Sequence, residues 1–272
     1  MQTDELKRIA SIARSKIILN SHKTGTPHLG SCLSCVDILV ALYFFKMRIN
    51  PQDFRLPDRD RFILSKGHGA AALFQILAIK GFYPEELLSD YGENGSLFAE
   101  HPPAPNYLPG IEAATGSLGH GLPIGLGMAI SSKISGINFN VYTLLGDGEC
   151  NEGSIWEAAT MAAAQKVDNL IIFIDANKWQ ATDRSADLVG ETLLKDKWKS
   201  FGWDTYEIDG NNMHEIVTIL SKKTIKGFPT AVILNTVKGK GVSFMEDDNN
   251  WHYRIPNKEE VDMAFIELGV KL

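Results

Sequence analysis

The chain has 272 residues, of which 44% are hydrophobic and 22% charged, and this composition excludes a fibrous or intrinsically disordered protein. Its formal net charge is −6 with dispersed charges, which excludes the basic surface of a nucleic-acid-binding protein. No apolar run approaches the roughly 18 residues of a membrane span, and the amphipathic N-terminal segment has no signal-peptide core. We therefore expect a soluble, cytoplasmic protein that binds neither nucleic acid nor membrane.

Short apolar segments alternate with helical patterns along the chain. Helices are predicted around 3–20, 31–47, 69–80, 119–135, 153–166, 191–201, 212–227 and 257–270, and strands at 61–64, 140–145, 170–175, 205–208 and 230–236. Strand segments such as NLIIFID and TAVILNT are almost wholly apolar, as in a parallel sheet covered on both faces. We predict one α/β domain over 1–272, with a doubly wound, mainly parallel sheet and helices on both faces.

Two long loops and a pair of cysteines stand out from this pattern. The segments 92–110 and 238–256 are predicted to be irregular, and loops of that length are usually functional or mobile. Cys32 and Cys35 form a C-x-x-C within the apolar run LGSCLSCVDILVALYF. Helical spacing puts both thiols on a packed face, so we predict buried small residues; a redox motif is the alternative.

Polar residues and glycines follow two neighbouring predicted strands. Gly146-Asp147-Gly148-Glu149 ends one strand, and Asp175-Ala176-Asn177-Lys178 ends the next. Because the carboxyl ends of parallel strands meet at one edge of a sheet, Asp147 and Asn177 are expected side by side. Their oxygens suit Mg²⁺ or Ca²⁺ shared with a phosphate ligand, which the glycines allow the backbone to approach. The helix that begins near Gly153 adds its dipole toward an anion, and the sequence therefore predicts a metal–phosphate site.

In these two clusters, Asp147 and Asn177 are thirty positions apart. Together the clusters resemble the thiamine diphosphate-binding motif. Further blocks look like those of transketolase and come in that family's order: His28-Leu29-Gly30-Ser31, Leu64-Ser65-Lys66-Gly67-His68-Gly69, Glu100-His101-Pro102, Thr115-Gly116-Ser117-Leu118-Gly119-His120-Gly121, and Lys238-Gly239-Lys240-Gly241 with Trp251-His252. The resemblance covers almost the whole chain. It is strongest to the N-terminal, diphosphate-binding subunits encoded by split transketolase genes.

The resemblance implies that thiamine diphosphate is the cofactor. Its metal, Mg²⁺ or Ca²⁺, would be held by Asp147, Asn177 and the backbone carbonyl of Trp179. Other residues are expected to contact the cofactor itself: Gly116 and Leu118 at the aminopyrimidine ring, Gly146, Gly148, Glu149 and Asn177 around the diphosphate, and also His68 and Glu152.

Four histidines are implied as catalytic residues. His68 and His252 resemble the histidines near the diphosphate and the reacting ring, and His28 and His101 those that meet the hydroxyls of the donor sugar. A surface or helix-capping role is the alternative for each of them. The remaining histidines are assigned no firm role, with His22 and His214 expected at the surface and His120 in packing or function.

Two further features of the sequence point to a neighbouring protein chain. Glu152 and Glu157 match acidic residues that couple two sites across a boundary between subunits, although they could simply complement the helix dipole. The segment GSLGHGLPIGLG over 116–127 carries five glycines, which cost helix stability. We expect this segment to pack closely against the cofactor or another protein chain, and we favour an interface helix.

The family activates its cofactor with a glutamate from a pyrimidine-binding domain, within hydrogen-bond reach of the aminopyrimidine. Because this chain stops at Leu272 before any such domain, we expect the pyrimidine-binding and C-terminal domains on a partner chain, in an α2β2 assembly. The expected reaction is transfer of a two-carbon ketol unit from a ketose phosphate to an aldose phosphate. The alternatives are a transketolase-like biosynthetic subunit with an unusual acceptor and a non-catalytic, cofactor-binding interaction subunit.

Overall fold

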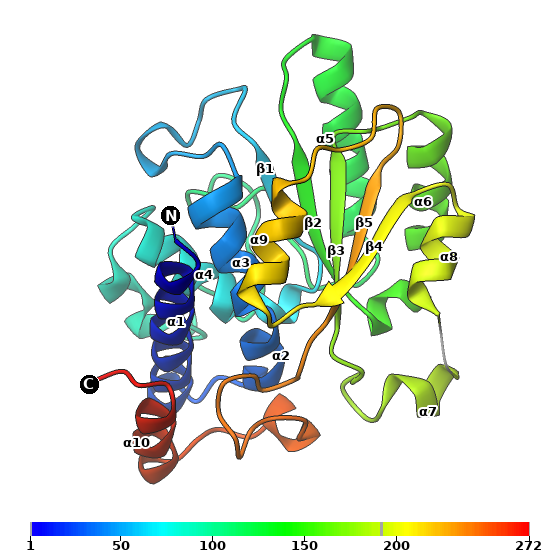
Figure 1. Ribbon diagram of the computed structural model, residues 1–272. Helices are drawn as coiled ribbons and strands as arrows, with labels where there is room; N and C mark the ends of the chain where they lie inside the picture. The colour runs from blue at the N-terminus through cyan, green and yellow to red at the C-terminus, as the bar shows by residue number, and fades with distance from the viewer. Residues whose placement is uncertain (1, 191–192, 272) are drawn as a thin grey trace.

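The computed structural model describes residues 2–190 and 193–271 (Figure 1). At its centre lies a sheet of five parallel strands in the order β1-β2-β3-β5-β4. The strands are β1 (Arg61–Leu64), β2 (Val141–Gly146), β3 (Leu170–Ala176), β4 (Asp204–Asp209) and β5 (Thr230–Asn235). Each overlaps its predicted segment, so the prediction of a parallel sheet is confirmed.

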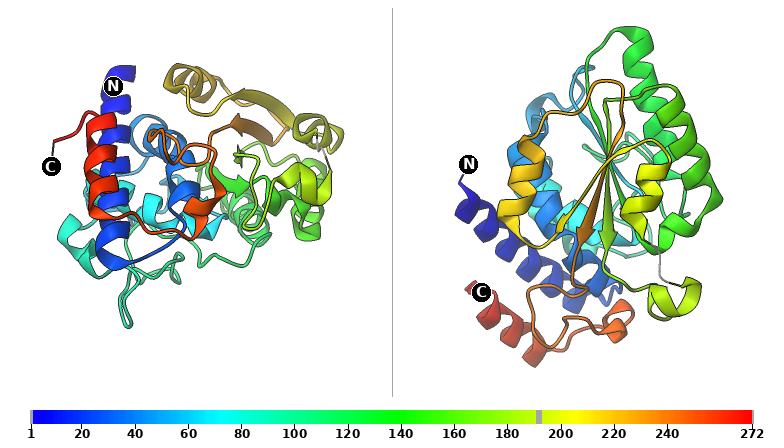
Figure 2. Two further views of the ribbon diagram at one scale, coloured as in Figure 1. Left: turned by 90° about the horizontal axis from the view of Figure 1, so that it is seen from below. Right: turned by 45° about the vertical axis from the view of Figure 1, so that its right-hand side comes forward.

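Helices cover both faces of the sheet, as Figures 1 and 2 show. Successive strand residues face opposite sides, so Leu144, Phe173 and Leu234 join the core under one set of helices, and Leu145 and Ile174 join the core under the other. The first set is α1 (Thr3–Thr24), α3 (Val36–Ala41), α4 (Ala70–Lys80) and α9 (Met213–Ser221), and the second is α5 (Gly121–Ser135), α6 (Gly153–Ala164) and α8 (Leu194–Ser200). This confirms the doubly wound α/β architecture.

Three further helices lie near the carboxyl ends of the strands or along α1. They are α2 (Leu29–Ser34), α7 (Ser185–Val189) and α10 (Lys258–Glu267), and α10 packs against α1 near both chain ends (Figure 2). Helix α7 has no counterpart among the predicted helices. No helix among residues 2–190 and 193–271 combines the length and apolar character that crossing a membrane requires.

The predicted helix 31–47 is broken in the structure. Helix α2 ends at Ser34, α3 begins one residue after Cys35, and a π-helical turn follows over Leu42–Lys46. Two backbone carbonyls of α2 accept hydrogen bonds from distant buried cations, Ser31 from Lys66 at 3.0 Å and Leu33 from Arg14 at 3.2 Å. Because these partners come from elsewhere in the chain, hydrophobic periodicity cannot reveal the break.

One other predicted helix is too long, and a second is described only in part. The predicted helix 212–227 ends at Ser221, where the following Lys222 adopts an extended backbone conformation. Residues 191–192 of the predicted helix 191–201 lie outside the described residues, and α8 accounts for most of the remainder. The predicted loop 92–110 is irregular throughout, whereas the loop 238–256 contains a short 3₁₀ helix at Asn249–His252.

The cysteine prediction is confirmed. Cys32 and Cys35 are both buried free thiols, as is Cys150. Burial raises the pKa of Cys32 to about 11 and that of Cys35 to about 12. Because the thiolate is the reactive species, these two residues act as packing groups rather than as a redox pair.

The glycine-rich segment does not form one helix, and its glycines serve the chain's own packing. The helix α5 begins only at Gly121, where a Cβ atom would clash with the Ser65 side chain, and at Gly125 a Cβ would lie 2.7 Å from Thr143 Oγ1. Gly127 faces open space. Close approach of α5 to β1 and β2 therefore explains the glycines at 121 and 125, whereas the expected contact of this segment with a cofactor or another protein chain stays a prediction.

We expect Gly125→Ala to lower the free energy of unfolding by about 1–3 kcal/mol, because the added methyl group must displace the buried Thr143 side chain. Gly127→Ala lies in the same helix without a close neighbour and should raise stability by roughly 0.5–1 kcal/mol. Urea unfolding followed by circular dichroism measures both values. Equal changes in the two variants would contradict the close contact between α5 and the sheet.

A candidate active site at the carboxyl ends of the strands

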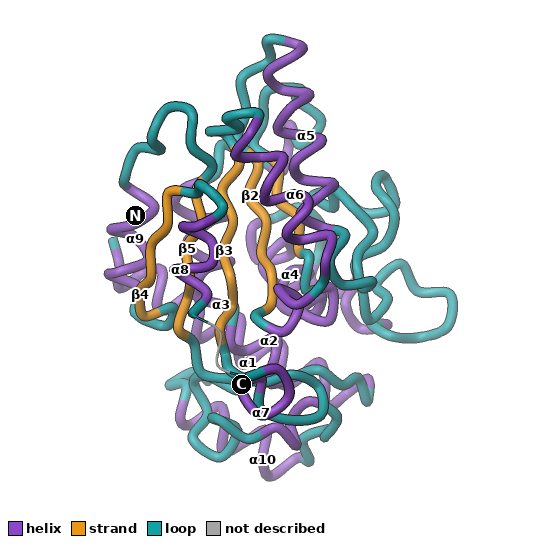
Figure 3. Tube along the Cα trace, turned by 90° about the vertical axis from the view of Figure 1, so that its right-hand side faces the viewer, coloured by secondary structure: helices purple, strands orange, loops and turns teal. Residues whose placement is uncertain are grey.

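Asp147 and Asn177 lie side by side, as the sequence predicts. Asp147 directly follows β2 and Asn177 directly follows β3, and these strands pair in parallel with Gly146 opposite Asp175. The Asp147 amide donates to the Asp175 carbonyl at 3.3 Å. Figure 3 shows that α2 and α7 lie beyond these strand ends, so the two side chains sit where doubly wound sheets bind ligands.

The two side chains have different surroundings. Asn177 is 4% exposed, and its Oδ1 accepts from the Trp179 amide at 3.0 Å, which places the Trp179 peptide beside it. Asp147 accepts from the Ser185 hydroxyl of α7 at 2.9 Å. Burial raises the pKa of Asp147 to about 6 despite this hydrogen bond. The protein itself therefore stabilises the negative charge of ionised Asp147 poorly.

Under these residues lies a buried ion pair that sequence reasoning missed. The Lys66 ammonium contacts the Asp175 carboxylate, and neither side chain has exposed surface. Burial alone would lower the pKa of Lys66 and raise that of Asp175, but their mutual attraction reverses both shifts. The Asp175 carboxylate also accepts a hydrogen bond of 3.2 Å from the side-chain amide of Asn177. The ion pair therefore orients Asn177, the predicted metal ligand. No local signal in the sequence links these two residues.

Glu149 and Gly148 hold the loop in shape. The buried Glu149 carboxylate accepts from the Gly119 amide at 2.9 Å, from the Gly146 amide at 3.1 Å and from the Ser65 hydroxyl. Its side chain therefore ties three segments together and has little capacity left for a ligand. A Cβ atom at Gly148 would lie 2.9 Å from Gln180 Cγ, so this position is closely packed.

The predicted aminopyrimidine contacts lie in the turn before α5. Gly116 has φ 135°, and a Cβ there would lie 2.8 Å from the His101 ring, so only glycine fits. Leu118 is half-buried, and its carbonyl lies 3.1 Å from Nδ1 of the exposed His120. The turn thus lies beside one of the four predicted histidines.

The four predicted histidines form one cluster, although they come from four separate segments. The His28 ring centroid lies 5.0 Å from that of His252, 5.9 Å from that of His101 and 6.1 Å from that of His68. A backbone hydrogen bond of 2.8 Å from His28 to the His252 carbonyl joins two of the segments. This proximity supports a shared function and argues against four unrelated surface roles.

Three of the four clustered histidines, His28, His68 and His252, have lowered pKa values. Burial lowers the pKa of His28, and burial together with Lys66 lowers that of His68 well below its ordinary value. Burial and Lys238 lower the pKa of His252 to about 3. A neutral imidazole has one donor and one acceptor nitrogen, so the cluster can both donate to and accept from hydroxyl groups.

Lys238 and Gln180 are further site residues that the sequence analysis did not assign. Lys238 Nζ lies 3.4 Å from His252 Nδ1 and donates to Asn249 Oδ1 at 2.5 Å, and burial lowers its pKa to about 8. Gln180 Nε2 and His28 Nδ1 are buried without a hydrogen-bond partner among the described residues. The Lys-Gly-Lys-Gly run could have singled out Lys238, whereas Gln180 has no comparable signal.

The structure places the remaining residues that the sequence singled out as follows. Glu152 and Glu157 are exposed at the start of α6, and neither forms an ion pair within the described part of the chain. His22 and His214 were both expected at the surface. His214 is exposed, but His22 is half-buried, and its Nδ1 lies 2.8 Å from the Pro256 carbonyl. Across the described residues, no three His, Cys, Asp or Glu side chains are placed to hold a metal ion by themselves.

Comparison with known proteins identifies relatives of similar length. The chain is 43% identical to one of the apulose-4-phosphate transketolase subunits, that of Actinobacillus succinogenes, over 97% of this chain and 96% of that protein. It is 41% identical to a 6-deoxy-6-sulfo-D-fructose transketolase subunit of Clostridium sp., over 90% of this chain and 89% of that protein.

Longer transketolases match with a smaller share of their own length. Human transketolase is 36% identical over 91% of this chain, which corresponds to 39% of the human protein. The structure of transketolase from Campylobacter jejuni superposes with a TM-score of 0.93 at 27% identity, over all of this chain and 44% of that one. Residues 6–271 match the family model of the transketolase thiamine diphosphate-binding domain. The chain therefore belongs to the transketolase family, of which it represents the thiamine diphosphate-binding domain.

Proposed function

We propose that the chain is the diphosphate-binding subunit of a two-subunit transketolase that moves a two-carbon ketol unit from a ketose phosphate to an aldose phosphate. The observation that carries this proposal is the meeting of Asp147 and Asn177 at adjoining strand ends, together with the cluster of four histidines. The relatives named as transketolase subunits support it. Thiamine diphosphate, when bound, carries the ketol unit between the two sugars.

The donor set fits a hard divalent cation that is shared with a diphosphate. Asp147 supplies a carboxylate and Asn177 an amide oxygen, and the Trp179 peptide lies next to Asn177. Because the described residues include no complete set of side-chain ligands, Mg²⁺ or Ca²⁺ would take the remaining oxygens from the diphosphate and the Trp179 carbonyl. The cation would also compensate the buried charge of Asp147.

The histidines would bind the donor sugar. We assign contacts with the donor hydroxyls to His28 and His101, and positions nearer the diphosphate to His68 and His252. The lowered pKa values of His28, His68 and His252 support this role, because a neutral imidazole offers a hydroxyl both a donor and an acceptor. Among the described residues the Nδ1 of His28 has no hydrogen bond, with the Glu100 carboxylate 3.9 Å away, so it can make such a contact.

The activating carboxylate would come from a partner subunit. Of the buried carboxylates at the site, Glu149 is occupied by two amides and a hydroxyl, Asp175 by Lys66, and Asp147 by the proposed metal. The exposed Glu152 and Glu157 on α6, with Ile124 and Met161 exposed on α5 and α6, provide a surface for that partner. We propose an α2β2 assembly with the cofactor between unlike subunits.

A second candidate concerns the donor. The two relatives of similar length are named for apulose-4-phosphate and for 6-deoxy-6-sulfo-D-fructose rather than for common pentose phosphates. These names favour a specialised ketose as the donor. Measurement of kcat/KM over a panel of ketoses, with the reconstituted complex, would separate the two candidates.

We expect thiamine diphosphate binding to require a divalent cation. Asp147→Asn should weaken binding roughly a hundredfold, about 2.7 kcal/mol, because it removes an anionic ligand of the cation. Asp58→Asn, at an exposed residue that precedes β1, serves as the control and should bind normally. Isothermal titration calorimetry with Mg²⁺ or excess chelator measures these affinities. Undiminished affinity in chelator would refute the metal site.

We expect the purified chain to lack ketol-transfer activity at any concentration of cofactor and metal, because the buried carboxylates Glu149 and Asp175 are already engaged by donors of the chain itself. Addition of a pyrimidine-domain subunit should restore turnover and tighten cofactor binding. A coupled spectrophotometric assay measures the rate. Turnover of roughly 1 s⁻¹ or more by the chain alone would overturn the proposal, and loss of that activity in Glu152→Gln would identify the internal carboxylate.

The same reconstituted complex tests the histidines. His28→Ala and His101→Ala should each raise KM for the donor roughly tenfold or more, since each loses a hydrogen bond to a hydroxyl. His68→Ala should also weaken cofactor binding. The exposed His214→Ala is the matched control. Unchanged kinetics in the His28, His101 and His68 variants would return these three histidines to a structural role.

We expect both His68 and His252 to resist protonation in the folded chain, and His252 to stay neutral at pH 5, because burial lowers both pKa values. The unfolded chain protonates its histidines near pH 6.5, so it binds more protons than the folded chain below that pH. Stability should therefore fall as the pH drops below about 6.5. NMR of the imidazole nitrogens reports the protonation state, and ordinary titration of both rings in the folded protein would contradict the assignment.

A further inference from the structure

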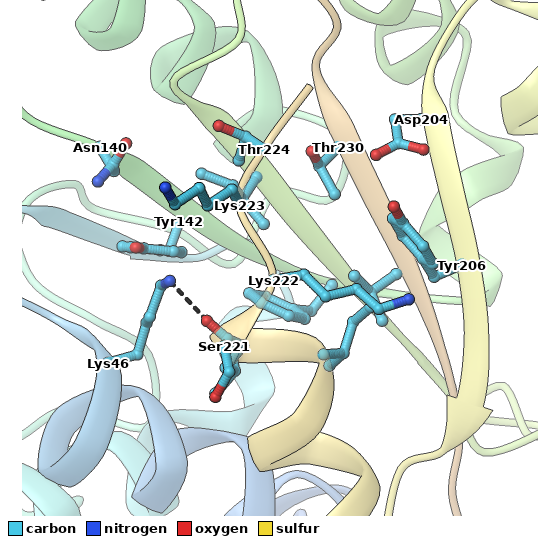
Figure 4. Close-up of a pocket in the computed structure, with 15 residues that line it drawn as sticks. Lys46, Asn140, Tyr142, Asp204, Tyr206, Ser221, Lys222, Lys223, Thr224 and Thr230 are labelled. Carbon is cyan, nitrogen blue, oxygen red and sulfur yellow. Dashed lines mark hydrogen bonds between the residues drawn. The ribbon is translucent and has the colours of Figure 1, made fainter. Parts of the chain in front are cut away.

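A cavity of about 430 Å³ lies at the amino-terminal end of the strands, at the opposite end of the sheet from the candidate active site (Figure 4). Its floor includes Tyr142, Phe173 and Val232, which face the same side of the sheet as α9. The cavity exists because α9 ends at Ser221 and leaves this end of the sheet face uncovered. Its volume is in the range of small-molecule sites.

The charges around this cavity favour an anion. Three lysines line it, Lys46, Lys222 and Lys223, against a single carboxylate, Asp204. Two of the lysines have partners in the protein: Lys46 Nζ donates to the Leu220 carbonyl at 2.5 Å, and Lys222 Nζ lies 4.6 Å from the centre of the Tyr206 ring.

The third lysine is available to a ligand. Lys223 is exposed and has neither an ion pair nor a hydrogen bond within the part of the chain that is described. Figure 4 shows the ammonium groups of Lys46 and Lys223 on the same side of the hollow as Tyr142. This side of the cavity is therefore positively charged.

The opposite side of the cavity presents two unused oxygen atoms. Asp204 and Thr230 are neighbours in the register of β4 and β5, and Figure 4 shows both beside Tyr206. Asp204 Oδ2 and Thr230 Oγ1 are buried without a hydrogen-bond partner among the described residues, and Thr230 is only 7% exposed. Buried polar atoms in native proteins nearly always have partners, so this pair indicates a missing donor.

We propose that this cavity binds the phosphate monoester of a polyol, either a sugar phosphate or the ribose phosphate part of a mononucleotide. The phosphate would lie at Lys46 and Lys223, and hydroxyl groups would donate to Asp204 Oδ2 and pair with Thr230 Oγ1. The carbon face of the sugar would pack on the exposed side of Tyr206. This site is separate from the proposed active site and does not depend on the proposed function.

Calorimetry on the full chain, saturated with Mg²⁺ and thiamine diphosphate, tests the proposal with ribose 5-phosphate, adenosine 5′-monophosphate and inorganic phosphate as probes. We expect one site per chain with Kd below about 1 mM for at least one of the two esters and weaker binding of inorganic phosphate. Tighter binding of the nucleotide would identify a mononucleotide as the source, and tighter binding of ribose 5-phosphate a sugar phosphate.

Matched variants locate the site. Lys223→Ala should weaken binding about tenfold through loss of a charge-assisted hydrogen bond, whereas Lys226→Ala, an exposed lysine of the same segment outside the cavity, should not. Thr230→Val should also weaken binding about tenfold, yet leave resistance to urea unchanged or higher, because the hydroxyl has no partner among the described residues. His101→Ala, in the candidate active site, should not change binding.

Three results would overturn the proposal. The first is no saturable binding of either ester. The second is equal binding of inorganic phosphate and the esters, which would remove the role of Asp204 and Thr230. The third is loss of binding in His101→Ala with normal binding in Lys223→Ala, which would place the ligand in the candidate active site.

Discussion

The buried carboxylate of Asp175 is the constraint on which the arrangement of the site depends. It accepts hydrogen bonds from Lys66 after β1, from Ser34 of α2, from Thr236 after β5 and from its neighbour Asn177. A charge removed from water is tolerated only when it is paired and fully hydrogen-bonded. Satisfying one carboxylate therefore fixes four segments relative to one another, including the residue proposed to hold the metal.

The same ion pair also shapes the electrostatics of the site. After burial, the positive charge of Lys66 is the second cause that lowers the pKa of His68 and that of Lys238. Lys238 in turn lowers the pKa of His252. Two buried ammonium groups thus favour the neutral forms of His68 and His252, which suits these rings to hydrogen bonds with uncharged sugar hydroxyls.

The sequence predicted the strands well because apolar, β-branched runs are local signals, and it placed Asp147 and Asn177 together because both follow adjacent parallel strands. The clustering of the four histidines was expected only from the family resemblance, since no local pattern joins segments so far apart. The Lys66–Asp175 pair and the break after Ser34 were missed for the same physical reason: both depend on side chains that meet only after the sheet has assembled. The sequence showed the glycines of α5. Their contact with Thr143 in β2 could not be predicted, because it depends on how the helix is positioned along the sheet.

The use of the carboxylates explains why the proposed activity needs a second chain. An activating acid must be free to share a proton with its cofactor, yet Glu149 and Asp175 are consumed in holding the loops and the ion pair. Freeing either one would leave buried donors or a buried ammonium group unpaired, so the fold cannot supply the acid without losing the geometry that binds the diphosphate. A carboxylate brought by a neighbouring chain escapes this conflict, because its desolvation occurs only when the two surfaces meet around the cofactor.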